Sequence, residues 1–256
     1  MPRVHVVSDV HARANALAKA GDGADAFICL GDLVLFLDYD DPAGGIFADL
    51  FGADAATRLI TLRTERRFDE ARQFSGELWE GIGRDRFTVI EEMIRGQYAD
   101  LFAAMPTPAY LTYGNVDVPR LYAEYVREGM QVLDGQTADI GGRRFGFVGG
   151  GLQTPMRTPY EIPDDEYAAK VAALGPVDVL CAHIPPAVPE LLYDVQARRM
   201  ERGSDAILDA IRDTSPELVL FGHVHNPLVR RTRIGRTECV NVGHFRGRGT
   251  PYVLEW

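Results

Sequence analysis

Residues 3–30 are RVHVVSDVHARANALAKAGDGADAFICL, and this stretch indicates the class of the fold. Two short runs within it, at 3–8 and 25–30, are rich in residues that favour β-strands. The segment between them, at 12–20, is rich in Ala and Leu and has a helical composition. A strand–helix–strand unit places its two strands parallel to each other. The chain is therefore predicted to be an α/β protein.

The same alternation continues towards the C-terminus. Six further runs with strand composition lie at 109–113, 144–148, 177–182, 217–221, 237–242 and 252–255. Helical patterns lie near 118–128, 164–174 and 204–213. Helices that alternate with strands, followed by closely spaced strands, predict a mixed sheet or two packed sheets with helices outside. The 256 residues fit one domain of this kind, because a single α/β unit commonly runs to about 250 residues.

The segment at about 54–105, between the second and third predicted strands, has a helical pattern instead of strand composition. Its second half carries apolar residues at steps of three or four, which is the period of an amphipathic helix. These residues are Phe87, Ile90, Ile94, Tyr98, Leu101 and Met105, and Pro106 follows them. We expect a helical hairpin inserted into the domain. Its apolar stripe either packs on the body of the protein, which we prefer, or forms a cap or dimer surface beside the site.

Composition and charge narrow the classes of function. Hydrophobic residues make up 46% and charged residues 25% of the chain, as in soluble globular proteins. The net charge of −10 argues against extended binding to nucleic acid. The sequence contains no apolar run long enough for a membrane span, and its first residues lack the apolar stretch of an export signal, so we expect neither membrane insertion nor export. Because the three cysteines stand far apart in apolar runs, we expect a cytoplasmic protein with reduced thiols and no membrane partner.

Polar side chains follow the ends of five predicted strands. In an open α/β sheet, ligands bind in the crevice beyond the carboxyl ends of the strands, so these side chains should converge on one site. Glycines at 31, 114 and 222 permit the sharp turns there. The polar residues are Asp9 and His11 after the first strand, Asp32 after the second, Asn115 and Asp117 after the third, His183 after the fifth, and His223 and His225 after the sixth.

Apart from Asp117, these side chains form a set of donors that favours two metal ions. Two carboxylates, one amide oxygen and four imidazoles, without a thiolate, suit Mn²⁺, Fe, Co, Ni or Zn²⁺. Seven side chains are too many for one open site, but they suffice for two ions that share a carboxylate at about 3.5–4 Å. The sequence has no serine elbow and no cysteine next to a motif histidine, so water is the expected nucleophile.

In their order, these residues resemble the motifs of the calcineurin-like metallophosphoesterases. The motifs of that family run D-x-H, G-D, G-N-(H or C)-(D or E), H and G-H-x-H, and all five occur in order from Asp9 to His225. The resemblance implies a four-layer α/β/β/α sandwich of two mixed sheets, forming a single domain over residues 1–256. It also implies an enzyme that hydrolyses phosphate esters by means of a two-metal-activated hydroxide.

The resemblance also assigns the metal ligands. The first ion would be held by Asp9, His11, Asp32 and His225, and the second by Asp32, Asn115, His183 and His223. Asp32 would then bridge the two ions. Among the metals that suit these donors we expect Mn²⁺, with Fe, Zn²⁺, Co and Ni as alternatives.

Two positions depart from the family pattern. The G-D block lacks the acidic residue that usually follows it and reads Gly31-Asp32-Leu33-Val34-Leu35. Val116 stands where many members carry a histidine that can protonate the leaving group, and G-N-V-D is closer to the phosphodiesterase-like branch. A general acid is worth about 10²–10⁴-fold in rate, so its absence favours phosphodiesters. A phosphomonoesterase or nucleotide hydrolase is the alternative enzyme, and a catalytically weak protein-binding scaffold is the alternative of another class.

The remaining assignments concern catalytic and supporting residues. Asn115 is expected to help neutralise charge on the phosphoryl oxygens, and Asp117 either orients substrate or solvent or supports its turn. His5 is predicted to be structural, and His244 lies either in the wall of the site or at the surface. Arg246, like four other loop arginines, is expected at the solvated surface. Small phosphate esters are the expected substrates, and a homodimer through the helical insertion is left open.

Overall fold

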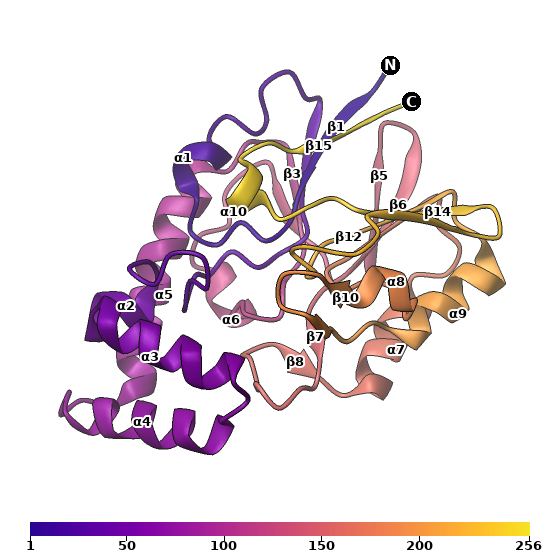
Figure 1. Ribbon diagram of the computed structural model, residues 1–256. Coiled ribbons are helices and arrows are strands. Elements are labelled where there is room, and N and C mark those ends of the chain that lie inside the picture. The colour runs from indigo at the N-terminus through magenta and orange to yellow at the C-terminus, as the bar shows by residue number, and fades with distance from the viewer.

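Two β-sheets form the centre of the computed structural model, which describes residues 1–256 (Figure 1). The first sheet has the order β15–β1–β2–β3–β4. Its strands are β1 (Arg3–Val7), β2 (Ala26–Cys29), β3 (Ala109–Leu111), β4 (Met130–Val132) and β15 (Tyr252–Glu255). Strands β1 to β4 are parallel, and β15 runs antiparallel to β1.

The second sheet has six strands in the order β13–β14–β12–β9–β6–β5. They are β5 (Gln136–Ile140), β6 (Arg143–Val148), β9 (Val179–Ala182), β12 (Leu218–Phe221), β13 (Arg231–Ile234) and β14 (Thr237–Asn241). The four central strands are parallel, and the edge strands β5 and β13 are antiparallel to their neighbours. Both sheets are therefore mixed, as predicted.

The central parallel strands are buried on both faces, which explains their sequences. β2, β9 and β12 have the sequences AFIC, VLCA and LVLF, and every residue in them is buried. Because both faces of a parallel sheet are covered, such strands are continuous apolar runs rather than alternating ones. Runs of this kind are easily found in a sequence, and all eight predicted strands are present.

Three apolar clusters hold the sheets and helices together. Val6, Ile28, Phe147 and Leu220 belong to the cluster between the two sheets. The outer face of the first sheet is covered by α1 (Ala14–Leu17), α5 (Arg86–Ala104) and α6 (Pro119–Tyr122), and that of the second by α7 (Asp164–Ala173) and α9 (Asp205–Thr214). Figure 1 shows these two groups of helices on opposite sides of the sheets. The clusters thus follow the order helix, sheet, sheet, helix.

Seven strands were not predicted because they carry no long apolar run. β5 (QTADI) and β13 (RTRI) are edge strands with exposed polar residues, and such residues protect a sheet edge from unwanted pairing. β4 has only three residues. The others are the two-residue strands β7 (Gly151–Leu152), β8 (Glu161–Ile162), β10 (Tyr193–Asp194) and β11 (Arg199–Met200).

The segment at 54–105 contains three helices, which differs from the expected two-helix hairpin. They are α3 (Ala53–Thr64), α4 (Phe68–Glu80) and α5, and α2 (Ile46–Phe51) precedes them. The chain breaks after α3 at Arg66, whose φ of 60° lies in the left-handed region that ends helices. Helices α2, α3 and α4 form an apolar cluster of their own, and Figure 1 places α3 and α4 at the edge of the molecule. The remaining helices are α8 (Pro189–Leu192) and α10 (Phe245–Arg248).

The apolar stripe of α5 packs on the body of the protein over most of its length. Ile94, Tyr98, Leu101 and Met105 are buried in the cluster on the outer face of the first sheet. Phe87, at the start of the helix, is 62% exposed. The partly buried Ile90 packs on the same cluster, so the packing alternative holds for the stripe from Ile90 onwards, and only Phe87 is left open to a partner.

Some smaller expectations can also be compared with the structure. Cys29, Cys181 and Cys239 are buried and form no disulfide, as expected. His5 is buried, and its Nδ1 lies 2.7 Å from the carbonyl oxygen of Ala20, which fits a structural role. None of the helices combines the length and the apolar character that crossing a membrane requires.

Replacing Ile94 by Ala should lower the free energy of unfolding by about 2–5 kcal/mol, because it removes buried atoms and leaves a cavity. The matched control on the same helix is Phe87→Ala, which removes a mostly exposed side chain and should cost about 0.5 kcal/mol or less. Urea unfolding of both variants measures the two values. Equal losses would mean that both ends of the stripe are buried alike, contrary to the structure.

Candidate metal centre

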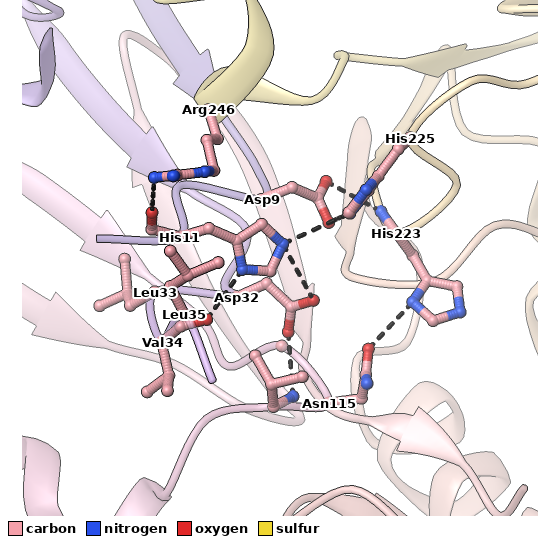
Figure 2. Close-up of polar contacts among 12 residues, drawn as sticks. Asp9, His11, Asp32, Leu33, Val34, Leu35, Asn115, His223, His225 and Arg246 are labelled. Carbon is pink, nitrogen blue, oxygen red and sulfur yellow. Dashed lines mark hydrogen bonds and ion pairs between the residues drawn. The ribbon is translucent and has the colours of Figure 1, made fainter. Parts of the chain in front are cut away.

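The carboxyl ends of five strands bring the seven predicted ligands together. Both sheets contribute to the site, and Figure 2 shows the labelled ligand side chains turned towards one another. Asp9 and His11 follow β1, Asp32 follows β2, Asn115 follows β3, His183 follows β9, and His223 and His225 follow β12.

The turns that present these ligands are tight and strained. A Cβ atom on Gly114 would overlap the carboxylate and backbone of Asp32, so only glycine fits where these two turns pass each other. Asp9, His11, Asp32 and His223 have left-handed backbone conformations, with φ between 43° and 66°. Such conformations cost about 1–3 kcal/mol each in residues other than glycine, and they cluster at functional sites. The strain in the backbone thus coincides with the proposed ligands.

The first group of donor atoms comes from Asp9, His11, Asp32 and His225. The Nε2 atoms of His11 and His225 lie 3.3 Å apart. His225 Nε2 is 3.4 Å from Asp9 Oδ1, and His11 Nε2 is 4.0 Å from Asp32 Oδ2. These are the four residues that the family resemblance assigned to the first metal.

The second group of donor atoms comes from Asp32, Asn115, His183 and His223. Asp32 Oδ2 lies 3.4 Å from His183 Nε2. Asn115 Oδ1 lies 3.1 Å from His183 Nε2 and 2.9 Å from His223 Nδ1. Since the same oxygen of Asp32 faces both His11 and His183, this carboxylate belongs to both groups.

Both groups fit the chemistry of a bound metal ion. Asp9 Oδ1 is buried and accepts no well-aligned hydrogen bond, although His225 Nε2 lies 3.4 Å away, and this is costly for a carboxylate oxygen unless a cation compensates it. The ring nitrogens of His11 and His225 face each other, so at least one of them presents a lone pair. Carboxylate and amide oxygens together with imidazole nitrogens are ligands of Mn²⁺, Fe, Co, Ni and Zn²⁺.

The electrostatics of the site favour a cation. Burial raises the pKa of Asp32, but the facing His183, together with His11, more than offsets this effect and holds the pKa at about 2. Burial lowers the pKa of His183, but Asp32 raises it to about 9. The pKa of Asp9 is also held well below its usual range, because His225, together with His183 and His11, more than offsets the effect of burial. Both carboxylates are therefore ionised near neutral pH, and a metal ion at His183 would have to displace a proton.

Backbone carbonyl groups orient two of the histidine rings. His11 Nδ1 donates to the carbonyl oxygen of Val34 at 2.8 Å (Figure 2), and His183 Nδ1 donates to that of Leu30 at 3.0 Å. A proton held on Nδ1 leaves Nε2 as the atom that can bind a metal. His223 differs, because its Nδ1 is the nitrogen that faces the second group.

Asp117 is completely buried behind the ligand turns. Its carboxylate accepts hydrogen bonds from the backbone N–H groups of Asp32 and Gly114 at 2.8 Å and of Leu33 at 2.9 Å. The hydroxyl of Tyr98 in α5 donates a further bond. These contacts tie together the turns after β2 and β3. They favour the supporting role of Asp117 over the alternative of contact with substrate or solvent.

Two residues beside the first group were not assigned to the site from the sequence. His244 stacks on His225, with ring centroids 3.9 Å apart and planes at 6°, so it forms part of the wall of the site. Arg246 in α10 donates to the carbonyl oxygen of His11 at 2.9 Å (Figure 2) and to Asp38 Oδ2 at 3.0 Å. The expectation of a solvated surface position for Arg246 is therefore wrong. Its place just after the Asn-Val-Gly-His turn is the one local signal of its role.

Comparison with known proteins supports the same interpretation. The chain matches the family model of the calcineurin-like phosphoesterases over residues 2–227. A search of curated proteins found no match.

Solved structures with the same fold are more distant in sequence. One crystal structure shares 17% sequence identity with this chain at a TM-score of 0.59, and the alignment covers 96% of this chain and 92% of the other. The crystal structure of TT1561 of Thermus thermophilus shares 16% identity at a TM-score of 0.55, with 96% and 90% covered. At these identities the likeness shows the fold alone. Because the family model matches most of the chain, including all seven predicted ligands from Asp9 to His225, the chain belongs to the calcineurin-like phosphoesterase family.

Proposed function

We propose that this protein is a dinuclear metal-dependent hydrolase of phosphate esters, with phosphodiesters preferred. One observation carries the proposal: Asp32 Oδ2 faces both His11 and His183 and so links two sets of donor atoms. When bound, two metal ions supply Lewis-acid chemistry, since they make a water molecule acidic and neutralise charge on phosphoryl oxygens. Mn²⁺ is the ion we expect, with Fe, Zn²⁺, Co and Ni as alternatives.

Within the second group, Asn115 acts as a metal ligand. Its Oδ1 faces His183 and His223, while its Nδ2 donates to Thr158 Oγ1 at 2.9 Å. The amide NH₂ group is thus held on the side away from the donor atoms. We therefore assign Asn115 to metal binding rather than to direct contact with a phosphoryl oxygen.

The residue after Asn115 supports the preference for diesters. Val116 donates its backbone N–H to Asp32 Oδ1 at 3.0 Å, and its side chain packs against the cluster on the outer face of the first sheet. An apolar side chain at this position offers no proton to a leaving group. Esters whose leaving group departs without a proton are favoured as a consequence.

Two other functions are the alternatives. A phosphomonoesterase or nucleotide hydrolase would use the same ligands and differ only in its substrate. A protein-binding scaffold would have no need of buried polar ligands such as Asp9 and His183, whose burial is costly. The complete set of donors therefore supports an enzyme.

The setting of the enzyme is also part of the proposal. The three buried cysteines without disulfides support a reducing compartment, for which we propose the cytoplasm. The substrates are small phosphate esters. The exposed Phe87 on α5 is the residue through which the helical insertion could form a homodimer.

A turnover screen of the purified protein with Mn²⁺ tests the proposed function. The substrates are an aryl diester, an aryl monoester and a cyclic nucleotide. We expect hydrolysis that is fastest with the aryl diester and that stops when a chelator removes the metal. Hydrolysis of monoesters alone would contradict the preference for diesters. If none of the three substrates is hydrolysed, the proposal that this protein is a phosphoesterase is contradicted.

Replacing Asp32 by Asn should weaken both metal groups, because it removes the charge that they share. Elemental analysis should find about two transition ions per wild-type chain and markedly fewer in the variant. Metal should also raise the melting temperature of the wild type more than that of the variant. Asp209→Asn, whose side chain is 65% exposed on α9, is the matched control and should keep the wild-type metal content. Equal metal content in all three proteins argues against a dinuclear centre.

Arg246 is expected to hold His11 in place for the first metal. Replacing Arg246 by Met keeps an apolar stem and removes the bonds to His11 and Asp38. The affinity for one of the two ions should then fall about 10–100-fold, as is usual when a residue that orients a ligand is lost. Arg233→Met, on the exposed edge strand β13, is the control in the same metal titration. Unchanged affinity for both ions would show that His11 keeps its position without Arg246.

Replacing Val116 by His tests whether a missing proton donor sets the substrate preference. Turnover of an alkyl monoester should rise relative to that of an activated aryl diester, by at most about 10²–10⁴-fold. The measurement is the ratio of the two kcat/KM values within one protein, because this ratio cancels differences in metal occupancy. Val116→Leu is the control, because it changes the size of the side chain but cannot donate a proton to the leaving group. A constant ratio, with both metals retained, would mean that another group already supplies the proton.

A further inference from the structure

We propose that Thr158 and Glu161 are positioning residues that fix the direction of the Asn115 amide and thereby complete the second metal group. The inference rests on the proposed function, because it concerns a ligand of the second ion. Neither residue belongs to one of the five sequence motifs. Thr158 lies in the segment that joins β7 to β8, and Glu161 is the first residue of β8. Thr158 is 43 positions from Asn115 in the chain.

A chain of three hydrogen-bonding side chains runs from Glu161 to the metal centre. Asn115 Nδ2 donates to Thr158 Oγ1 at 2.9 Å, and Thr158 Oγ1 donates to Glu161 Oε1 at 2.8 Å. Glu161 also accepts from the hydroxyl of Thr154 at 2.8 Å and from its backbone N–H at 2.6 Å. The carboxylate of Glu161 is thus held by groups other than Thr158.

The polarity of this chain allows only one direction of the amide. An ionised carboxylate accepts hydrogen bonds and donates none, so the single hydroxyl proton of Thr158 points to Glu161. The oxygen of Thr158 can then only accept from Asn115, and the NH₂ group is the only part of the amide that can donate. The amide oxygen of Asn115 is consequently directed towards His183 and His223.

The opposite direction of the amide would remove a metal ligand. The oxygen and NH₂ ends of an asparagine have nearly the same shape, so packing alone does not distinguish them. Turned round, Asn115 would present N–H groups to the metal in place of a lone pair. Thr158 and Glu161 therefore supply the chemical asymmetry that the shape of the amide lacks.

The backbone holds this segment in place without the Thr158 side chain. The N–H of Tyr160 donates to the carbonyl oxygen of Asn115 at 2.8 Å, and the N–H of Gly151 donates to that of Tyr160 at 3.0 Å. A Cβ atom on Gly151 would lie 2.8 Å from Asn115 Cβ, so the two segments touch directly. Removal of the hydroxyl of Thr158 should therefore leave the fold of the segment intact.

The test is a titration of the metal-free full chain with Mn²⁺, in which electron paramagnetic resonance measures the free ion. Thr158→Val removes the hydroxyl with little change in shape and should weaken binding of one ion about 10–100-fold while the other binds as in wild type. Thr158→Ser keeps the hydroxyl and should restore both affinities. Thr214→Val, at the exposed end of α9, removes a hydroxyl that donates only to the carbonyl oxygen of Ala210 in its own helix, and it is the matched control, with both affinities unchanged. Melting of the metal-free variants should stay close to that of wild type.

Three results would overturn the inference. Thr158→Val could bind both ions as tightly as wild type, or it could weaken both ions alike. Thr158→Ser could fail to restore the affinity that Thr158→Val loses, which would point to the loop rather than to the hydroxyl. If the wild-type protein binds fewer than two ions, the proposed dinuclear function is wrong, and the inference that rests on it is wrong too. The results above instead contradict only the role of Thr158, because the wild type still binds two ions in them.

Discussion

The buried carboxylate of Asp32 contacts both the backbone that forms the site and the histidines of both donor groups. The residue is 3% exposed, and its two carboxylate oxygens contact different partners. Oδ1 accepts the backbone N–H of Val116 at 3.0 Å, while Oδ2 faces His11 and His183. A buried charge is costly unless its surroundings compensate it. Here the compensation comes from an N–H donor, from the histidines and, in the proposed function, from two cations.

Placing one carboxylate between two donor sets requires both sheets and a support for each turn. The apolar cluster between the sheets fixes the distances between the strand ends, so the geometry of the ligands depends on packing away from the site. Asp117 ties the turns after β2 and β3, and Arg246 holds the turn after β1. In our further inference Thr158 does the same for Asn115. These contacts offset the strain of the left-handed residues in the site.

Sequence patterns predicted those parts of the molecule that are encoded locally. Buried parallel strands are continuous apolar runs with the ligands at their ends, so the strands and the donor residues were found together. The edge strands β5 and β13 were missed because their residues are polar and exposed. The helix break at Arg66 depends on a backbone conformation that its residue type does not reveal. The contact of Arg246 with Asp38 spans 208 positions, and no local motif encodes a contact that only the complete fold creates.

Anomalous diffraction from crystals grown with Mn²⁺ would locate the metal ions directly. We predict two anomalous peaks about 3.5–4 Å apart, with the carboxylate of Asp32 bound to both. His11 and His225 should bind the first ion, and His183 and His223 the second. A single peak, or two peaks that do not share Asp32, would contradict a dinuclear centre built around this carboxylate.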